Sequence, residues 1–278
     1  MSERYVCKLS PDLIKKAAED LNEPSGDAEK HQAIDKLKTA FSEEKYGPLT
    51  RQDDLFFLRF LRAKKYNHDK ALKCLQNYHK VRKSYTEVFD KLNNPVLMRD
   101  QLERNVIFML EGKARDGAAV MLYRPGLLDK EVDMHALMAY SVMSIEKLLE
   151  EESVQICGLR SLEDMEGFNL SSLFKISLSE LAKMNSIWMD AMPIRFRAAH
   201  LINEGRVYDA IMKLMRPFMS KKMLDRVKCH GTDMDSVHEF IEKRWLPPYL
   251  NGDGATCEAM GLKWREVLSE DWPKDTEL

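Results

Sequence analysis

Residues 193–203, Pro-Ile-Arg-Phe-Arg-Ala-Ala-His-Leu-Ile-Asn, limit the fold more than any other part of the chain. Residues 198–202 are apolar except for one histidine, which predicts a strand that is buried on both faces. Strands of this kind belong to parallel sheets covered by helices. Alternation along the extended chain places Arg195 and Arg197 on one face. Two adjacent guanidinium groups can bind a phosphate through paired N–H donors, so the segment predicts an anion site beside a buried sheet.

The rest of the chain after residue 98 alternates short apolar runs with helical patterns. Two such runs joined by a link that ends in Asp116-Gly117 predict a β-hairpin. Strands and helices then alternate, which predicts parallel strands with right-handed crossovers beside the antiparallel hairpin. The segments in order are hairpin strands 106–110 and 118–123, helix 134–149, strand 158–165, a helix to residue 190 capped by Ser177 or Ser179, and the strand through Ile202.

Residues 1–93 carry only helical patterns. Ser10 and Asn67 are expected to cap two of these helices. In the third helix, leucines repeat at helical spacing, and Arg59 and Arg62 lie together on another side. The expected helical segments are 11–21, 33–42, 54–64 and 69–82.

Charge is distributed unevenly along the chain. The net charge of −2 argues against a general nucleic-acid binder. Residues 193–230, however, contain nine basic and three acidic side chains, a local excess of +6. Each lysine alone is best explained as ordinary solvated surface, but for the whole cluster we favour an anion-binding patch.

Methionines are concentrated in the same part of the chain. Of 17 methionines, only the initiator precedes Met98. Methionine is flexible and polarizable, and it is common where a surface must adapt to an awkward ligand, although each residue alone could be core filler. A methionine-rich helix at 207–219, next to two arginines, suggests that the protein handles lipid.

The cysteines and apolar segments indicate the compartment. Five scattered cysteines without a CxxC spacing predict reduced thiols in the cytoplasm and no disulfide framework or zinc site. The longest apolar stretch, 134–145, is too short to span a bilayer, which needs ~20 residues. We therefore expect a soluble protein without a transmembrane segment.

No catalytic constellation is evident. Glu163, Asp164 and Glu166 could suggest metal ligation or paired acid–base carboxylates. Consecutive strand residues point to opposite faces, however, and no histidine lies nearby, so we expect these acids to be solvated or to cap a turn. His200 is expected to be a hydrogen-bonded core histidine. The signatures of hydrolase nucleophile turns, phosphate-binding loops, zinc proteases and dinucleotide folds are missing from the sequence. We expect no enzyme activity, metal or cofactor.

Several motifs in order resemble the CRAL-TRIO lipid-binding family. Phe-Leu-Arg-Ala-Lys-Lys-Tyr at 60–66 resembles the signature of its helical N-terminal domain, and Asp-Met-Glu-Gly-Phe at 164–168 resembles its acidic turn. Residues 193–203 and Arg-Pro-Phe at 216–218 are similar to the branch that contains alpha-tocopherol transfer protein and cellular retinaldehyde-binding protein. Gly205, where the family commonly has proline, is one departure.

The resemblance implies a CRAL-TRIO α/β fold. It is a mixed, mostly parallel sheet with flanking helices and a mobile gate helix, preceded by an all-helical N-terminal domain. The domains implied are a helical domain at 1–93, a lipid-binding domain at 94–256 and a C-terminal tail at 257–278. The function implied is transfer of one small hydrophobic ligand, tocopherol- or retinoid-like, carried as cargo in a gated pocket. Carotenoids, sterols and phospholipids remain alternative cargoes.

Pocket and membrane residues follow from the resemblance by position. The cargo-binding residues implied are Met138, Ser141, Ile145, Met184, Ile187, Trp188, Met192, Ala199, Val207, Ile211 and Met215. Each could equally be a packed core residue, and the Ser141 hydroxyl could instead bond to its own helix. The residues implied for phosphatidylinositol bisphosphate are Lys64, Arg195, Arg197, Lys222 and Arg226.

The resemblance also implies where the protein works and with what. We expect a monomer in the cytoplasm that binds peripherally to endosomal or plasma membranes. The alternative function is a phosphoinositide-reading adaptor with a vestigial pocket. Stoichiometric cargo would distinguish the carrier from the adaptor.

Overall fold

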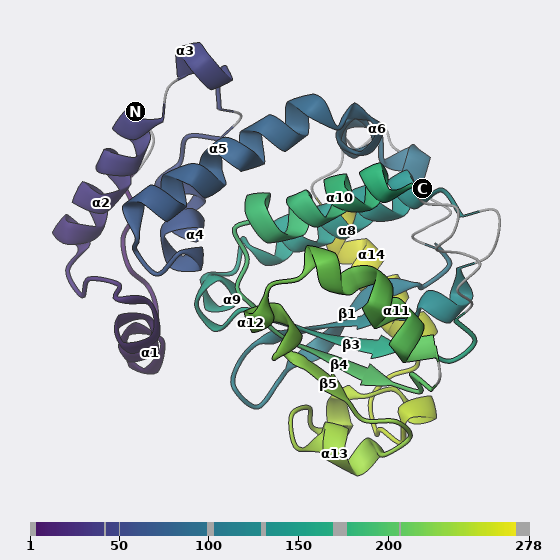
Figure 1. Cartoon of the computed structure of the whole chain (residues 1–278). Helices are drawn as coiled ribbons and strands as arrows, with labels where there is room; N and C mark the ends of the chain where they lie inside the picture. Colours follow the sequence, from purple (N-terminus) through teal and green to yellow (C-terminus); the bar gives the residue numbers. More distant parts are fainter. Residues whose placement is uncertain are drawn as a thin grey trace. The chain divides into compact units, whose positions relative to one another are not determined.

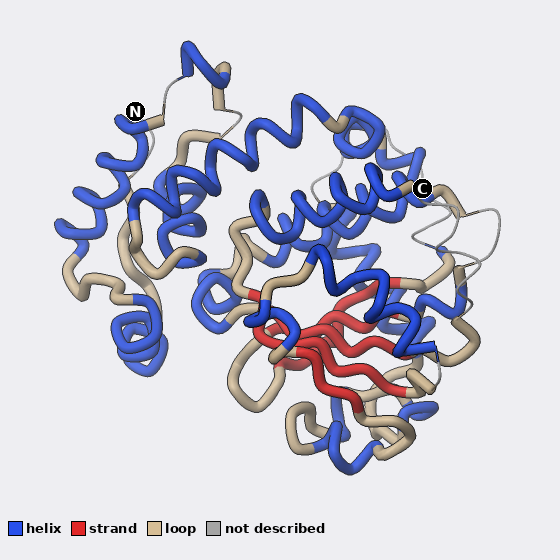
Figure 2. Tube along the Cα trace, in the orientation of Figure 1, coloured by secondary structure: helices blue, strands red, loops and turns tan. Residues whose placement is uncertain are grey.

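The computed structural model consists of two compact units (Figures 1 and 2). The first unit comprises Met1–Thr86, Leu149–Gly158 and Lys183–Arg195, and the second comprises Glu87–Leu148, Leu159–Ala182 and Phe196–Leu278. The domain limits expected from the sequence stay a prediction. The structure describes residues 4–41, 43–49, 51–98, 103–128, 132–168, 177–205 and 207–270.

The first unit is helical, as predicted. The Ser10 hydroxyl caps the first helix by accepting the Leu13 N–H at 3.4 Å, and the Asn67 side chain caps another by accepting the Lys70 N–H at 3.0 Å. The second helix begins earlier than expected, directly after Gly26. The helices are α1 Pro11–Leu21, α2 Asp27–Ala40, α3 Glu43–Tyr46, α4 Asp54–Ala63, α5 His68–Ser84, α9 Glu152–Cys157 and the π-helical turn Ile187–Ala191.

Helix α4 is buried on almost every side, and this includes its two arginines. Arg59 and Arg62 have no exposed surface. Arg62 forms a fork with the buried carboxylate of Glu23, with both N···O distances at 2.8 Å. It also donates to Gln155 at 2.8 Å and lies 2.9 Å from Glu152. Since Gln155 and Glu152 lie on α9, this guanidinium fixes α9 within the first unit.

The second unit contains a five-stranded sheet in the order β1-β2-β3-β4-β5. The hairpin of β1 and β2 is antiparallel, and every other pair is parallel, as the sequence predicts. Gly117 closes the hairpin turn with a φ of 83°. The short fifth strand was not anticipated. The strands are β1 Ile107–Lys113, β2 Ala119–Tyr123, β3 Leu159–Asp164, β4 Phe196–Ile202 and β5 Val227–Cys229.

Further short helices complete the chain. Ser177 caps α10 by accepting the Glu180 N–H at 3.2 Å, which confirms one of the two predicted caps. The helices are α6 Thr86–Phe89, α8 Met134–Leu148, α10 Leu178–Ser186, α11 Val207–Met215, α12 Lys221–Leu224, α13 Met234–His238 and α14 Cys257–Ser269. Single 3-10 turns cover Asp90–Asn93, Pro95–Met98, Pro125–Leu127, Arg216–Phe218, Lys243–Trp245 and Pro248–Leu250.

The strand order decides where the helices of the second unit lie. Parallel strands that follow one another in order, with right-handed crossovers, place their connecting helices on one face of the sheet. Figure 1 shows α8 and α11 on one side of the sheet and α13 on the other. Helix α8 is fixed to the sheet by Tyr140, whose hydroxyl donates to the Ile107 carbonyl at 2.7 Å. We call the side under α8 and α11 the helix face and the other side the α13 face.

The α13 face holds a buried polar chain. His200 has no exposed surface, and its two ring nitrogens lie 2.9 Å from Arg160 Nη1 and 2.9 Å from His230 Nε2. Phe240 covers both His200 and Arg160. This confirms the expected hydrogen-bonded core histidine. Burial, and then the charge of Arg160, lower the pKa of His200 to about 4.

The end of β4 is anchored to the loop after β5. The Asn203 N–H donates to the Gly231 carbonyl at 2.8 Å. The Gly231 N–H in turn donates to the Glu204 carboxylate, at 3.0 and 3.1 Å from its two oxygens. These hydrogen bonds hold Asn203 and Glu204, the residues directly after β4, against the loop at Gly231.

Removing the Arg62 fork is expected to destabilise the first unit strongly. Arg62→Met keeps an apolar stem but leaves the Glu23 carboxylate buried without its partner, which costs about 3–5 kcal/mol of the free energy of unfolding. Arg51→Ala is the control, because Arg51 is half exposed and its pair with Asp53 contributes at most about 1 kcal/mol. Urea unfolding followed by circular dichroism measures both. Equal losses in the two variants would contradict the assignment.

The buried His200 is expected to make stability depend on pH. Its pKa in the folded state lies below the 6.5 of an unfolded chain, so the unfolded state binds more protons as pH falls from about 6.5 to 4. Between pH 7 and pH 5 this lowers the free energy of unfolding by about 2 kcal/mol. His200→Asn should remove this part of the pH dependence, while His135→Asn, at a partly exposed histidine, should retain it. Urea unfolding at both pH values checks the difference.

Candidate functional site

The two faces of the sheet differ in chemistry because successive side chains of a strand point to opposite faces. On β3, Arg160 points to the α13 face, where it meets His200. Ser161 and Glu163 therefore project to the helix face. Pairing places Ser161 beside Ala199 and Glu163 beside Leu201, so apolar side chains of β4 flank both polar residues.

Three side chains on the helix face of β2 and β3 keep some solvent-accessible surface. Tyr123 and Glu163 are register partners on the adjacent strands β2 and β3. Protein encloses both side chains deeply, yet each keeps part of its surface accessible to solvent. Met121, on the same face of β2, is also partly accessible although it lies in an inner strand.

Four of the predicted cargo residues lie on α8 and β4 of the second unit. Met138, Ser141 and Ile145 are buried on α8, and Ala199 is buried on β4. The Ser141 hydroxyl donates to the Leu137 carbonyl of its own helix at 2.8 Å, which is the alternative that the sequence left open. Its hydrogen is therefore already used within α8.

The other predicted cargo residues lie elsewhere. Ile187 and Met192 are buried, and Met184 and Trp188 are half-buried; all four belong to the first unit. Residues 207, 211 and 215 lie on α11, but the side chains of Val207, Ile211 and Met215 are outside the described part of the structure. Whether any of these residues contacts cargo stays a prediction.

Arg195 and Arg197 bind different partners. Strand β4 begins at Phe196, so the alternation expected from residue 194 does not extend to Arg195. The Arg195 guanidinium donates to the Ile156 carbonyl and lies 3.9 Å from Asp20. With a side chain only 9% exposed, Arg195 has little surface left for an external phosphate. This corrects the expectation that the two arginines share one face of a strand.

A β-bulge accounts for the direction of Arg197. Leu159 pairs with Phe196 and Arg160 pairs with Ala198, which leaves Arg197 as the extra residue of β4. The Arg197 side chain lies 3.5 Å from the carboxylate of Asp116, and Arg160 binds the same carboxylate at 2.9 Å. Asp116, on the β1–β2 turn, therefore stands where an external anion would bind Arg197. These contacts hold the pKa of Asp116 below its usual range, with the Arg160 hydrogen bond as the main favourable cause against burial.

Other predicted basic residues surround the start of β5. Arg226 donates to the Phe196 carbonyl, and burial followed by the nearby Arg197 charge lowers its pKa. Lys222 is exposed on α12, whose first turn is capped by Ser220. We call Arg197, Lys222 and Arg226 the basic cluster. Lys64 ends α4 in the first unit and is partly buried.

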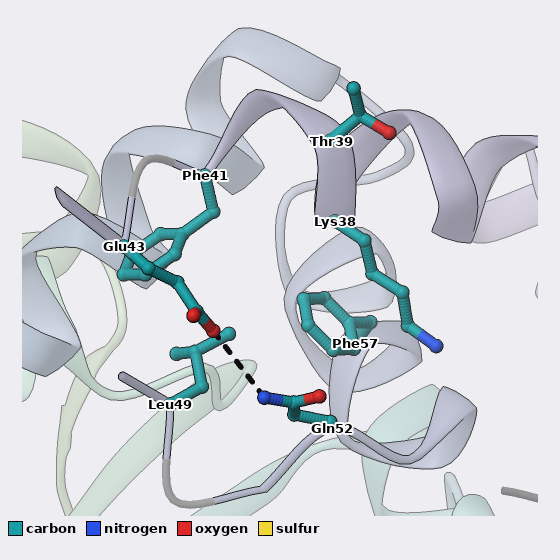
Figure 3. Close-up of a pocket in the computed structure, with 7 residues that line it drawn as sticks. All are labelled: Lys38, Thr39, Phe41, Glu43, Leu49, Gln52 and Phe57. Carbon is teal, nitrogen blue, oxygen red and sulfur yellow. Dashed lines mark hydrogen bonds between the residues drawn. The ribbon is translucent and has the colours of Figure 1, made fainter. Parts of the chain in front are cut away.

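A separate pocket lies in the first unit (Figure 3). Its volume is about 460 Å³. Its polar side chains are engaged, since Lys38 binds Asp54 at 2.7 Å and Gln52 donates to Glu43 at 3.3 Å. None of the predicted cargo or phosphate residues lines it. The lining residues are Lys38, Thr39, Phe41, Glu43, Leu49, Gln52 and Phe57.

Two family models match this chain. The model of the CRAL/TRIO domain matches residues 103–252, and that of the CRAL/TRIO N-terminal domain matches residues 33–77. The chain belongs to the CRAL/TRIO family. The resemblance found in the sequence motifs is thereby confirmed, as is the mixed α/β fold preceded by helices.

Individual CRAL/TRIO relatives match over nearly the whole chain. Alpha-tocopherol transfer protein-like of Homo sapiens is 33% identical over 274 residues, covering 96% of this chain and 78% of that protein. Clavesin-1 of Rattus norvegicus is 27% identical over 272 residues, covering 97% and 76%. The crystal structure of Sfh5 superposes with a TM-score of 0.52 at 15% identity, covering 95% of this chain and all of that one, and supports the fold.

Two further findings bear on this CRAL/TRIO chain. Within the described residues, no helix is both long and apolar enough to cross a bilayer. The same residues contain no group of three or more His, Cys, Asp or Glu side chains arranged to hold a metal ion.

Sequence reasoning missed two residues of the site and misjudged a third. Asp116 was recognised only as part of a turn, and Ser161 was not considered. Glu163 was expected to be solvated or to cap a turn, but it lies enclosed on the helix face and accepts a hydrogen bond from Ser161 at 2.7 Å. The available signal was alternation: Arg160, Leu162 and Asp164 share the α13 face, so Ser161 and Glu163 must face the helices.

Releasing Arg197 from Asp116 is expected to strengthen binding to anionic membranes. Asp116→Asn removes one negative charge and leaves Arg197 with a weaker partner, so affinity for vesicles containing phosphatidylinositol bisphosphate should rise about fivefold, or about 1 kcal/mol. Asp225→Asn makes the same charge change at an exposed position and should raise it less. Vesicle co-sedimentation measures both. An equal rise would show that only net charge matters.

Proposed function

We propose that this chain is an intracellular lipid carrier that binds one small hydrophobic ligand between the helix face of its sheet and the helices above it. The observation that carries the proposal is that the CRAL/TRIO domain model matches residues 103–252, the stretch that forms this sheet and its helices, and that alpha-tocopherol transfer protein-like matches over 96% of the chain. An apolar ligand that binds there gains about 25 cal/mol for every Å² of its surface removed from water. The name of the human relative, alpha-tocopherol transfer protein-like, supports a tocopherol- or retinoid-like cargo. The carrier performs no chemistry on it.

The gate in this proposal is α11. Its chain begins after Gly205, which has a φ of 47° and open space where a side chain would be. It ends at a 3-10 turn that contains Pro217, a residue that cannot continue a helix. An element bounded by a glycine and a proline can move as one piece, so cargo would enter and leave when α11 swings away from the sheet.

The basic cluster is proposed to dock the carrier on the cytoplasmic face of membranes. Each basic side chain near an anionic leaflet contributes about 1 kcal/mol. Arg197 precedes the gate in the chain, and Lys222 and Arg226 follow it. A phosphoinositide head group bound there would then favour the open gate, and cargo would in turn weaken head-group binding.

The decisive experiment measures cargo and transfer together. Protein purified from eukaryotic cells is analysed by native mass spectrometry and lipid extraction, and then assayed for transfer of extracted lipid between vesicles. We expect about one apolar molecule for each chain. Arg197→Ala with Arg226→Ala should weaken binding to phosphatidylinositol bisphosphate vesicles by about 30-fold while cargo content stays unchanged.

Lys243→Ala with Lys263→Ala provides the matched control, since both lysines are exposed and lie outside the basic cluster. This double variant loses the same charge and should bind vesicles more strongly than the cluster variant. Protein that carries no lipid yet binds vesicles through the basic cluster would favour the adaptor over the carrier.

A further inference from the structure

A row of hydrogen bonds on the α13 face links β3, β4 and the loop after β5 to helix α13. Arg160 Nη1 on β3 lies 2.9 Å from His200 Nε2 on β4, and His200 Nδ1 lies 2.9 Å from His230 Nε2. His230 comes directly after β5 and reaches Ser236 on α13, with 2.6 Å between Nδ1 and Oγ. We call Arg160, His200, His230 and Ser236 the histidine relay.

Both ends of the histidine relay fix the direction of its hydrogen bonds. A guanidinium has donors and no acceptor, so Arg160 donates and His200 Nε2 must accept. At the other end, the Ser236 hydroxyl donates to the Asp233 carbonyl at 2.8 Å, so its oxygen accepts from His230 Nδ1–H. His200 then donates from Nδ1 to His230 Nε2. The two ends thus require the same state, in which both rings are neutral and carry hydrogen on Nδ1.

An added proton breaks the histidine relay at either ring. On His230 the proton would sit on Nε2 and face the N–H of His200. On His200 it would also sit on Nε2, where it would face the guanidinium of Arg160. In both cases two donors meet across a distance of 2.9 Å, so one of the hydrogen bonds has to separate.

Charged groups face both rings from the surrounding elements. Burial lowers the pKa of His230, although three carboxylates act in the opposite direction. His200 has no exposed surface, whereas His230 is half-buried, so a proton enters the relay more easily at His230. The charged neighbours are Glu204, Asp233 and Glu239 around His230, and Arg160, Asp116 and Lys228 around His200.

The histidine relay holds a segment that has few other attachments. Strand β5 is three residues long and lies at the edge of the sheet. The His230 N–H donates to the Leu201 carbonyl at 2.9 Å, and Gly231 is bonded to Asn203 and Glu204. A short edge strand of this kind can open locally while the rest of the sheet stays folded.

We propose that the histidine relay is an acid-sensitive latch. It holds β5 and the loop after it against β4 while both histidines are neutral, and it releases them when a proton enters the relay. The inference goes beyond the carrier function and does not depend on it. Because Arg226 of the basic cluster directly precedes β5, the latch would make the position of that side chain depend on pH.

The size of the effect follows from the buried ring. His200 has a pKa of about 4 in the closed segment and would return towards 6.5 in the open one. The open segment therefore binds more protons as pH falls from about 6.5 to 4, and opening becomes more favourable. Between pH 7 and pH 5 the equilibrium for opening should rise about 20-fold.

Hydrogen exchange of the full-length protein at pH 7 and pH 5 measures this opening. After correction for the intrinsic exchange rate, amides 199–204 and 227–231 should open about 20-fold more at pH 5. Amides 107–109 of β1, at the other edge of the sheet, should change much less. An equal change in both regions would show unfolding of the whole unit and would overturn the latch.

Two matched variants test the role of the relay. His200→Gln keeps one donor and one acceptor but cannot titrate, so the ratio of opening between the two pH values should largely disappear. His238→Gln removes a histidine of α13 outside the relay and should keep the ratio of the wild type. A variant that only weakens the segment raises exchange at both pH values and leaves the ratio unchanged. The latch is wrong if His200→Gln keeps the ratio or if both variants lose it equally.

Nitrogen NMR of the histidine rings at pH 7 tests the direction of the relay. His200 and His230 should both carry hydrogen on Nδ1 and none on Nε2. Hydrogen on Nε2 of either ring would reverse a bond of the relay, and the proposed mechanism of release would then fail.

Discussion

The handedness of the strand crossovers is the constraint on which the second unit depends. Strands β2 to β5 follow one another in order, and right-handed connections between them leave α8 and α11 on a single face. The opposite face is then left for chain that comes after β5, and Phe240 covers it beside His200. A sheet wound in this way has one face covered by crossover helices and one closed by the C-terminal chain. The proposed ligand site lies on the face that the crossover helices α8 and α11 cover.

Alternation then lets one strand serve two purposes. Arg160 of β3 binds Asp116 and His200 on the closed face, where aromatic and ion-pair contacts fix the sheet. Ser161 and Glu163 of the same strand lie on the helix face, where they hydrogen-bond to each other. The rigid side supports the binding side, because the backbone that positions Glu163 is the backbone that Arg160 anchors. Side chains on the helix face alternate with those on the closed face, so they can differ in chemistry while the contacts of the closed face stay the same.

Local signals in the sequence predicted most of the helices and strands. The features that sequence reasoning missed depend on strand pairing between distant parts of the chain. Caps at Ser10 and Asn67 and the turn at Gly117 depend on neighbours within four residues, so the sequence revealed them. Strand β5 has three residues, too few for a period to be visible. The bulge at Arg197 depends on the register of a strand more than thirty residues away. The neighbouring acids Asp164 and Glu166 suggested that Glu163 is exposed to solvent. Only the tertiary structure shows that helices cover its face of the sheet.

The hydrogen bonds of Gly231 with Asn203 and Glu204, which we call the clasp, bear on the gate that we propose for α11. Two backbone-linked contacts, from Asn203 and to Glu204, tie the end of β4 to the loop after β5. In the proposed gate, the hinge is therefore Gly205, the first residue beyond the clasp, and β4 stays in place. The far end of the gate returns through α12 to β5, which is the strand that leads into the clasp. The proposed gate thus belongs to a segment of chain that starts and ends beside the same hydrogen bonds. Such a segment can swing as a whole while its two ends stay together.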